Sequence, residues 1–244
     1  MARTFLIRGL LCGVVAGVLV FLCAKLFGEP NVDGAIAVQS AIAKAAGEAP
    51  EPEIVSRSTQ ASWGLFVGTM AFSIAMGGIF SLVFAFFWGR LGGLGARASS
   101  LLIAAGAFIT VYLVPFLKYP ANPPSVGNPE TIGYRTFLYF GMIVISIVAL
   151  VVVYNLGRSL AQKNERWNVL LICGVSYLIV IAFAYAILPS IDEVPKQFPA
   201  TLLWNFRLSA LGIQAVLWAV LGLLFGELTE RSLARRPSGL VRRA

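Results

Sequence analysis

Hydrophobic residues gather into six long runs along the chain, and short polar stretches separate one run from the next. The runs lie at about residues 5–27, 61–88, 99–117, 136–156, 167–188 and 202–225. Each is close to or longer than the roughly 20 residues that an α-helix needs to cross the hydrocarbon core of a bilayer. The pattern predicts an all-α polytopic membrane protein with six transmembrane helices, in a single integral membrane domain over residues 1–244.

The first run must be distinguished from a secretory signal peptide, because MARTFLIRGLLCGVVAGVLVFLC has a basic start and an apolar core. That core is long enough to span a bilayer, and no small-residue cleavage site follows it. We therefore expect a retained first helix. In the polar segment 31–60 we expect AIAVQSAIAKAA to form a short surface helix and GEAPEPE to be non-helical.

Basic residues are unevenly distributed between the two ends of the predicted spans. Twelve of the 19 lysine and arginine residues fall on the side of the N-terminus, whereas eight of the 11 acidic residues fall on the opposite side. Because cytoplasmic loops carry the excess of basic residues, both termini are expected in the cytoplasm, with residues 231–244 as a basic tail. The net charge of +8 is then a topology signal and a lipid contact.

The composition mainly excludes classes of protein. Hydrophobic residues make up 58% of the chain and charged residues 12%, about half the charged fraction of a soluble domain. A soluble fold and a nucleic-acid partner are therefore not expected. The sequence contains no histidine, and Cys12, Cys23 and Cys173 lie inside apolar runs, where we expect them to pack between helices. With no nucleophile–base pair, nucleotide-binding loop or redox ligand pair, neither an enzyme nor a cofactor is expected.

Glycines recur every fourth residue inside several runs, which places them on one face of a helix. Small residues at this spacing let helix backbones approach closely. We predict helix packing at Gly9, Gly13 and Gly17 in the first run, Gly64 and Gly68 in the second, and Gly222 and Gly226 in the sixth.

The six spans resemble three hairpins that each leave and re-enter the N-terminal side, and the loop VPFLKYPANPPSVGNPETIGYRT is the tip of the middle one. Prolines fix φ and stiffen this loop, and the structural positions are Pro115, Pro120, Pro123 and Pro124. One interpretation is a rigid turn between Lys118 and Arg135, whose side chains reach the lipid headgroups. In the other, three such tips converge into an outer vestibule.

The vestibule interpretation predicts ion pairs between Arg135 or Arg207 and the carboxylates of Glu130, Asp192 or Glu193. Deeper in the bilayer, Gln214 is the best polar candidate, although it also fits an interhelical hydrogen bond. The candidate ion pathway and outer vestibule comprise Glu29, Lys118, Glu130, Arg135, Asp192, Glu193, Arg207 and Gln214. Which residues hold a metal is unknown, because transition-metal ions prefer imidazole, carboxylate and thiolate ligands and the chain has no imidazole.

The proline loop, followed far downstream by FPATLLWNFRLSALGIQ, resembles the CbtA family, membrane proteins described as probable cobalt transporter subunits. The resemblance extends to the arginine-containing start, its Gly-x-x-x-Gly helix and Glu29-Pro30. It implies a bacterial plasma-membrane subunit of a cobalt uptake system, with a small single-span, histidine-rich partner. It also places functional weight on Pro120, Pro123, Pro124, Arg135, Trp204 and Arg207.

Two functions follow as hypotheses. In the first, the six helices provide a permease-like path for cobalt or another divalent cation together with a partner. In the second, the chain is a non-transporting accessory or scaffold protein that packs against partner helices through its glycine faces. The absence of charge inside the spans favours the second hypothesis, and the acidic outer loops favour the first.

Overall fold

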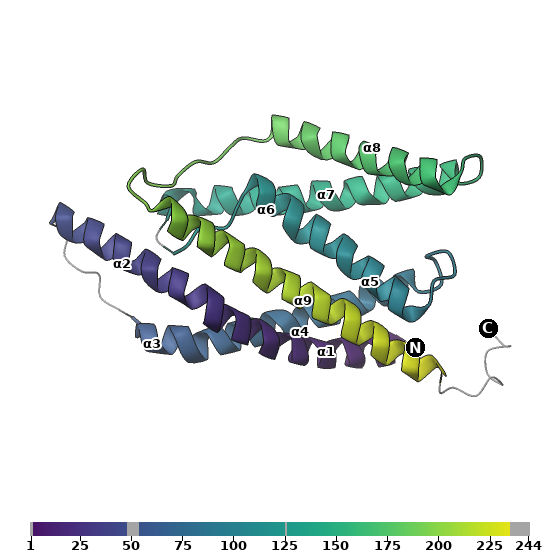
Figure 1. Cartoon of the computed structure of the whole chain (residues 1–244), viewed down its shortest axis with the longest axis horizontal. Coiled ribbons are helices and arrows are strands. Elements are labelled where there is room, and N and C mark those ends of the chain that lie inside the picture. The colour runs from purple at the N-terminus through teal and green to yellow at the C-terminus, as the bar shows by residue number, and fades with distance from the viewer. Residues whose placement is uncertain (1, 48–53, 125, 235–244) are drawn as a thin grey trace. The chain divides into compact units, whose positions relative to one another are not determined.

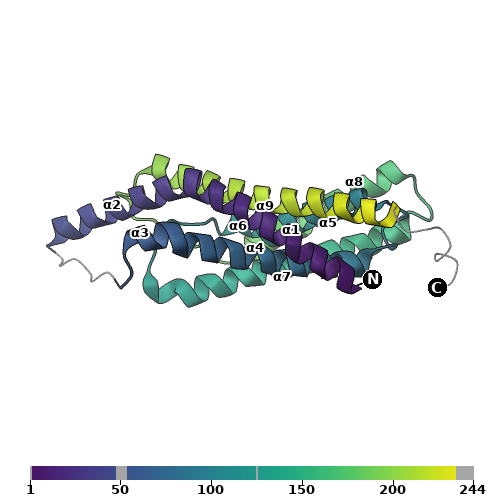
Figure 2. The same cartoon turned by 90° about the horizontal axis from the view of Figure 1, so that it is seen from below.

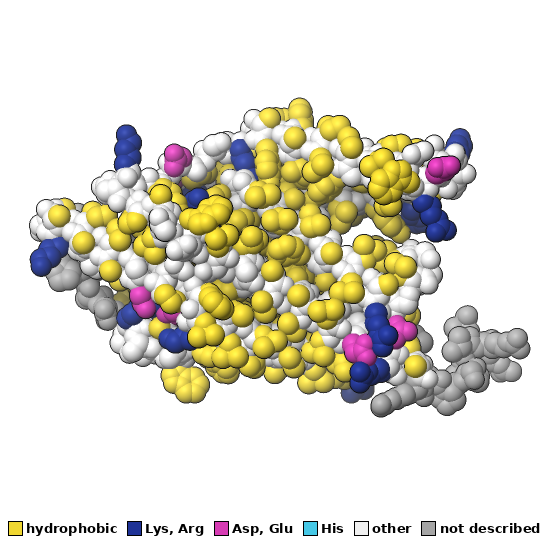
Figure 3. Space-filling view, in the orientation of Figure 1, with side chains coloured by type: hydrophobic (Ala, Val, Ile, Leu, Met, Phe, Trp, Pro, Cys, Tyr) yellow, Lys and Arg dark blue, Asp and Glu magenta, His cyan; other side chains and the backbone are white. Residues whose placement is uncertain are grey.

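The computed structural model describes residues 2–47, 54–124 and 126–234, and these residues form helices and loops without a strand. Six helices among them are long and apolar enough to cross a membrane: Ala2–Ala46, Arg57–Phe87, Ala96–Lys118, Pro129–Leu160, Arg166–Ile187 and Ala200–Ala234. On the face drawn in Figure 3, hydrophobic side chains cover the middle of the helices and charged side chains gather at their ends. The predicted all-α fold with six spans is confirmed.

The first span continues well past its predicted end at residue 27. It consists of α1 (Ala2–Cys23), the π-helical segment η1 (Ala24–Gly28) and α2 (Glu29–Ala46), which ends at Gly47 with a φ of 73°. At 1.5 Å per residue these 45 residues extend about 68 Å, more than twice the thickness of a hydrocarbon core. The expected surface helix AIAVQSAIAKAA is therefore helical but joined to the first span. The expectation for GEAPEPE lies largely outside the described residues.

Prolines inside the first and third spans each follow a π-helical segment. Pro30 follows η1, and Pro115 follows η3 (Phe108–Leu113) at the start of α6 (Val114–Lys118). A proline in a regular helix clashes with the carbonyl four residues before it, and a π turn widens the backbone at that position. The helix therefore passes both prolines, and the first span continues beyond the end predicted for it at residue 27.

The remaining spans follow the predicted ranges with small extensions. The second contains α3 (Arg57–Thr59), η2 (Gln60–Gly64) and α4 (Leu65–Phe87), and the third begins with α5 (Ala96–Ala107). The fourth contains η4 (Pro129–Thr131) and α7 (Ile132–Leu160), and the fifth and sixth are α8 (Arg166–Ile187) and α9 (Ala200–Ala234). The first four residues of the predicted basic tail therefore belong to α9, and residues 235–244 lie outside the described part.

Contacts divide the chain into two compact units. The first unit comprises Met1–Phe108 and Thr201–Ala244, and the second comprises Ile109–Ala200. In the first unit, α1 and α4 lie side by side, and α9 runs along the same group of helices (Figures 1 and 2). In the second unit the principal helix pair is α7 and α8, which are the fourth and fifth spans and so belong to different predicted hairpins.

The glycines of α1 allow the close approach of α4, as predicted. A Cβ atom at Gly9 would lie 2.3 Å from the Gly77 carbonyl oxygen, one at Gly13 would lie 2.6 Å from the Ser73 carbonyl oxygen, and one at Gly17 would meet the Met70 side chain at 2.7 Å. At Gly9 and Gly13 the nearest atoms belong to the α4 backbone, so α1 fits α4 there only with glycine, whereas at Gly17 the nearest atom is the sulfur of a flexible side chain.

Gly64 and Gly68, at the start of the second span, do not contact α1. A Cβ atom at Gly68 would meet no atom of the described chain within 4 Å, and one at Gly64 would meet only the Thr59 carbonyl of its own span. Gly77 and Gly78 are the α4 glycines that face α1. The spacing of Gly64 and Gly68 was right for a packing face, but spacing alone does not say which face of a helix is covered.

The sixth span uses its glycines as predicted, against α5. A Cβ atom at Gly222 would lie 2.7 Å from the Ala104 Cβ, and one at Gly226 would lie 3.0 Å from the Ser100 Cβ. The Ser100 hydroxyl donates to the Gly222 carbonyl at 2.7 Å. The pair of α5 and α9 is therefore held by close backbone approach.

Candidate functional site

One end of the first unit, which we call the Arg57 end, gathers two carboxylates around one guanidinium. Glu29 and Asp33 are one turn apart on α2 and so project from one face. Arg57 forms an ion pair with Glu29, and its Nε donates to Asp33 Oδ1 at 2.9 Å. Only 8% of Glu29 is exposed, so Arg57 compensates a nearly buried carboxylate.

The π-helical segments at this end present backbone carbonyls to side chains of other helices. A π turn takes carbonyls out of the regular hydrogen-bond ladder. The Phe27 carbonyl in η1 accepts from Ser209 Oγ of α9 and from Asn31 Nδ2, both at 2.7 Å. Asn31 Nδ2 also lies 3.0 Å from Ser209 Oγ, and Lys25 Nζ donates to the Ala61 carbonyl in η2 at 2.9 Å. These groups form a polar layer next to the carboxylates.

A hollow of about 200 Å³ opens among α1, α4 and α9 in the first unit. Its lining is Val20, Gly68, Thr69, Phe72, Ile213, Gln214 and Leu217. Gln214 lies five residues, or about 7.5 Å along α9, from Ser209 of the polar layer. The Thr69 hydroxyl donates to the Leu65 carbonyl at 2.8 Å, which leaves its oxygen able to accept from or coordinate another group.

The Gln214 amide has no hydrogen-bond partner within residues 2–47, 54–124 and 126–234. It lies well inside the apolar part of α9, and an amide without a partner in an apolar medium costs several kcal/mol. Its two donors and one acceptor therefore remain available for something that enters the hollow. Sequence reasoning singled out Gln214 by its depth, but the hollow beside it could not be read from the sequence.

Two further polar atoms without partners lie one helical turn deeper. Ser73 Oγ is one turn beyond Thr69 on α4, and Trp218 Nε1 is one turn beyond Gln214 on α9. Both atoms are buried, and neither has a hydrogen-bond partner in the described part of the chain. Buried polar atoms in folded proteins are nearly always paired, so these two are exceptions, and each lies one helical turn along the chain from a residue that lines the hollow.

Closely packed aromatic side chains follow Trp218 toward the other end of the unit, which carries Ala2 and Ala234 and is called the Ala2 end. The Phe84 ring centroid lies 4.9 Å from that of Phe225 and 5.3 Å from that of Phe5, and the Phe80 and Phe225 centroids are 5.4 Å apart. Phe84 and Phe225 are fully buried. We call the polar groups from Arg57 through Ser209 to Gln214 the polar line. It ends at this group of phenylalanines, which we call the aromatic plug.

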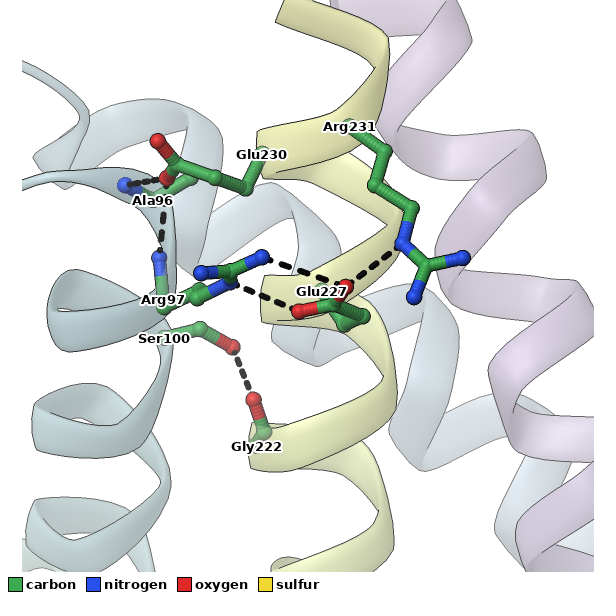
Figure 4. A network of polar contacts seen from close by, with 7 residues as sticks. All are labelled: Ala96, Arg97, Ser100, Gly222, Glu227, Glu230 and Arg231. Carbon is green, nitrogen blue, oxygen red and sulfur yellow. Dashed lines mark hydrogen bonds and ion pairs between the residues drawn. The ribbon is translucent and has the colours of Figure 1, made fainter. Parts of the chain in front are cut away.

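Ionic contacts join α5 and α9 at the Ala2 end (Figure 4). Arg97 donates to both oxygens of Glu227, at 2.6 and 3.2 Å, and Arg231 donates to Glu227 from one turn further along α9. Glu230 accepts from the backbone N–H groups of Ala96 and Arg97, at 2.7 and 3.3 Å. These are the first N–H groups of α5, which have no partner inside the helix, so Glu230 caps α5 from another helix.

In the second unit, the end of α6, where the proline loop begins, is tied to the C-terminal end of α8. Lys118 Nζ donates to the Tyr185 carbonyl at 2.8 Å and lies 3.3 Å from Ser190 Oγ. The Tyr119 hydroxyl donates to the Pro189 carbonyl at 2.9 Å, and burial raises the pKa of that hydroxyl. Lys118 had been expected to reach lipid headgroups, but it binds the carbonyl end of α8, where unpaired carbonyls favour a cation.

Glu193, in the loop between α8 and α9, contacts the loop between α6 and α7 within the second unit. Its Oε2 accepts from the Thr131 hydroxyl and the Asn128 N–H, each at 2.9 Å, and lies 3.4 Å from Arg135 Nε. The Thr131 hydroxyl, then the Asn128 N–H and the Arg135 charge hold the pKa of the Glu193 carboxyl below its ordinary value, against a smaller opposing effect of burial. The expected pairing of Arg135 with a carboxylate of the next outer loop is thus present.

The other residues predicted for the pathway belong to different units. Glu130 and Asp192 are exposed in the second unit, while Glu29, Arg207 and Gln214 belong to the first unit, where Trp204 is also exposed. Of the loop prolines, Pro115 and Pro123 are buried, Pro120 is half-buried and Pro124 is exposed. The ion-pathway role of these residues stays a prediction.

Several residues of the polar line were not singled out from the sequence as site residues. Asn31, Asp33, Arg57, Thr69 and Ser209 are single polar residues near or inside apolar runs, with no shared motif. The carbonyls of η1 and η2 are backbone groups, so the sequence does not distinguish them from those of other residues. No group of three or more histidine, cysteine or acidic side chains that could hold a metal ion occurs among the described residues.

The family described as probable cobalt transporter subunit (CbtA) matches residues 2–230. No curated protein and no solved structure matches the chain. Because the match covers nearly the whole sequence, the chain belongs to the CbtA family, and it is a membrane subunit of a cobalt transport system.

Proposed function

We propose that this CbtA-family subunit carries the transported cation along the polar line of its first unit, from the Arg57 end to the hollow at Gln214. The single observation that carries the proposal is the unpaired Gln214 amide beside an open hollow at the depth of a membrane span. An interior polar group of this kind is rare in membrane helices and marks substrate pathways by default.

Each step of the proposed path uses a different chemistry. The carboxylates of Glu29 and Asp33 attract the cation, and Arg57 holds them until it arrives. The layer at Phe27, Asn31 and Ser209 then offers neutral oxygens, which Co²⁺ binds less strongly than imidazole or thiolate. Weak ligands suit a path, because an ion must leave each position as readily as it enters. Past Gln214 the aromatic plug at Phe84 and Phe225 must separate for the ion to continue.

A partner supplies the metal selectivity in this proposal. Co²⁺ prefers imidazole among protein ligands, and the chain has no histidine. A small single-span, histidine-rich subunit next to the Arg57 end would collect the ion and pass it to Glu29 and Asp33. The proposal includes no catalytic step.

The proposed orientation follows the basic residues. The Ala2 end, with Arg3, Arg8, Arg97 and Arg231, faces the cytoplasm, and the Arg57 end faces outward. The chain is then a multi-pass protein of the bacterial plasma membrane with both termini inside, and the path leads from the outside inward.

Radiocobalt accumulation in cells tests the proposal. Cells with the gene and its neighbours should accumulate more cobalt than cells lacking only this gene, and the Glu29→Gln/Asp33→Asn double variant should fall toward the deletion. The matched control is Asp192→Asn, which changes an exposed carboxylate of the second unit and should retain uptake. Unchanged uptake in the double variant, at equal protein level, would contradict the proposal that the cation path runs through the first unit.

The scaffold function keeps one specific observation in its favour. Gly68 has open space around it and lines the same hollow, so a partner helix could enter there and pair with Gln214. Under this alternative, Gly68→Leu abolishes co-purification of the partner. Under the transport proposal, Gly68→Leu lowers uptake and the partner still co-purifies.

A further inference from the structure

The Ala2 end of the first unit carries a second and larger hollow, which the proposed path does not use. It has a volume of about 570 Å³ and is lined by Arg3, Thr4, Ile7, Arg8 and Leu11 of α1 and Leu228 of α9. The aromatic plug and the Gln214 hollow are formed by other residues, so a ligand of this second hollow is independent of the cation path.

The lining has a charged part and an apolar part, which suits a ligand with a charged headgroup and an apolar tail. Two guanidinium groups and a hydroxyl come from the first two turns of α1, and aliphatic side chains follow. Ile7 and Leu11 lie four and eight residues after Arg3 on one helix face, so they are about 6 Å and about 12 Å deeper along the axis. They are 49% and 60% exposed, and Leu228 is 39% exposed, which leaves an open apolar wall below the charges.

Arg8 is held at the wall of the hollow, and the neighbouring acidic residues of α9 are bound by other groups. Arg8 Nη1 donates to Thr229 Oγ1 at 2.9 Å, and Thr229 is fully buried, so this guanidinium is fixed at the wall. Arg3 has no ion-pair partner among the described residues. Glu227 and Glu230, the acidic residues of this part of α9, are bound by Arg97, Arg231 and the N–H groups that begin α5.

We propose that this hollow binds an anionic phospholipid, with the headgroup phosphate between Arg3 and Arg8 and one acyl chain along Ile7, Leu11 and Leu228. Guanidinium groups bind phosphate oxygens through paired N–H donors, and Thr4 adds a hydroxyl donor. The sequence beyond Ala234 adds four arginines and no acidic residue, so it adds attraction of the same sign. A zwitterionic lipid offers the same phosphate but brings its own cation, which the two arginines repel.

Lipid binding to the purified full-length chain in detergent tests the proposal. Native mass spectrometry would count bound dioleoyl-phosphatidylglycerol and dioleoyl-phosphatidylcholine during a titration with each. The wild type should retain phosphatidylglycerol in preference. Arg3→Gln should reduce this preference about fivefold, and Arg3→Gln/Arg8→Gln about thirtyfold, since each basic residue at a membrane surface contributes on that scale.

Arg8→Gln removes the bond to Thr229 and could also weaken the fold, so a second pair of variants keeps both arginines. Thr4→Glu places a carboxylate between the guanidinium groups, and Thr4→Gln is the neutral variant of the same shape. Glutamate in the first turn of a helix is favourable, so Thr4→Glu should fold. The Thr4→Glu variant should lose the preference for phosphatidylglycerol, and Thr4→Gln should keep it.

Arg90→Gln is the control for charge alone, because Arg90 is also basic and lies outside the hollow, with its guanidinium over the Phe86 ring. It should leave the preference unchanged. An equal loss in Arg90→Gln, or an equal preference in Thr4→Glu and Thr4→Gln, would overturn the proposal in favour of a general surface charge effect. Stabilisation by inorganic phosphate as large as that by phosphatidylglycerol would overturn the lipid as the source of the phosphate.

Discussion

At the scale of single residues, the chemistry of the first unit depends on polar groups that the fold leaves without partners. Gln214, Ser73 and Trp218 have polar atoms with no hydrogen-bond partner among the described residues, and all three lie within two turns of one hollow. Their unpaired state costs stability, because each could be replaced by an apolar group of similar size. A protein keeps such groups where a ligand completes them.

Replacing Gln214 tests this reading directly. Gln214→Leu should lower radiocobalt uptake about tenfold, the effect of losing one hydrogen bond or ligand of about 1.4 kcal/mol, and should raise stability by about 1–3 kcal/mol. Unfolding by denaturant in micelles measures the second effect. Gln39→Leu on the exposed face of α2 should change neither quantity. A Gln214→Leu variant that loses stability would show that the amide has a structural partner.

The glycines of α1 and α4 give a second residue-level prediction. Gly13→Ala should lower the free energy of unfolding by about 1–3 kcal/mol, because its Cβ would lie 2.6 Å from the Ser73 carbonyl oxygen. Gly68→Ala meets no atom within 4 Å and should be neutral or stabilising by up to about 1 kcal/mol, through helix propensity. Equal effects of the two substitutions would contradict the packing of α1 against α4.

At this scale, the sequence shows the type of each residue and its depth in a predicted span, but it does not show which residues of other helices it contacts. The Gly-x-x-x-Gly spacing identified Gly9, Gly13 and Gly17 correctly, and the same spacing at Gly64 and Gly68 described an open face. Gln214 stood out because an amide is rare inside a span. Thr69 did not, because threonine pairs easily with its own helix.

At the scale of elements, π-helical segments determine where the long helices pass their prolines and where they expose carbonyls. The segments η1 and η3 precede Pro30 and Pro115, and the Phe27 carbonyl of η1 is bound from α9. A proline usually ends a helix, so a helix that continues through Pro30 is not expected from the sequence alone. The six runs themselves were predictable, since each alone meets the length and apolarity of a span.

The loops around Glu193 give a prediction on pH. The Thr131 hydroxyl, the Asn128 N–H and Arg135 favour the charged carboxylate and lower its pKa in the folded protein. A lowered folded pKa stabilises the fold above the ordinary value of 4.5, and this stabilisation is lost as the pH falls through the folded pKa. Glu193→Gln should therefore be less stable than the wild type above that value, and the difference should shrink below it.

Thermal unfolding of both proteins across this pH range measures the effect. Glu130→Gln is the matched control, because Glu130 is an exposed carboxylate in η4, next to Thr131, and the variant should unfold as the wild type does at every pH. A difference between Glu193→Gln and the wild type that persists unchanged at low pH would mean that charge on Glu193 does not hold the loops.

At the scale of the whole molecule, the sequence predicts orientation through the bias of its basic residues, and the helices make that prediction testable. A cysteine at Ser40, on the exposed face of α2, should react with a membrane-impermeant thiol reagent added outside the cell. A cysteine at Ala234, the last residue of α9, should react only after the membrane is opened. Labelling of both from one side would contradict the odd number of crossings, five, that the six spans place between them.

The grouping of helices was less predictable than their number. The repeated loop pattern suggested pairs of consecutive spans, and α1 with α4 fits it, but α7 packs mainly against α8 of the next hairpin within the second unit. Which helices pack depends on matching faces, such as the Ser146 hydroxyl and the Tyr177 hydroxyl 2.7 Å apart, and a single sequence does not specify these matches.

The central claim is that cobalt enters the hollow at Gln214 from the Arg57 end, and the reactivity of a cysteine at Thr69 tests it most directly. In a protein without Cys12, Cys23 and Cys173, Thr69→Cys should react with a small charged thiol reagent added outside, and Co²⁺ should slow the reaction in the wild-type background but not with Gln214→Leu. A cysteine at Thr69 that never reacts from outside, or reacts at the same rate with and without Co²⁺ while uptake is intact, would contradict the account.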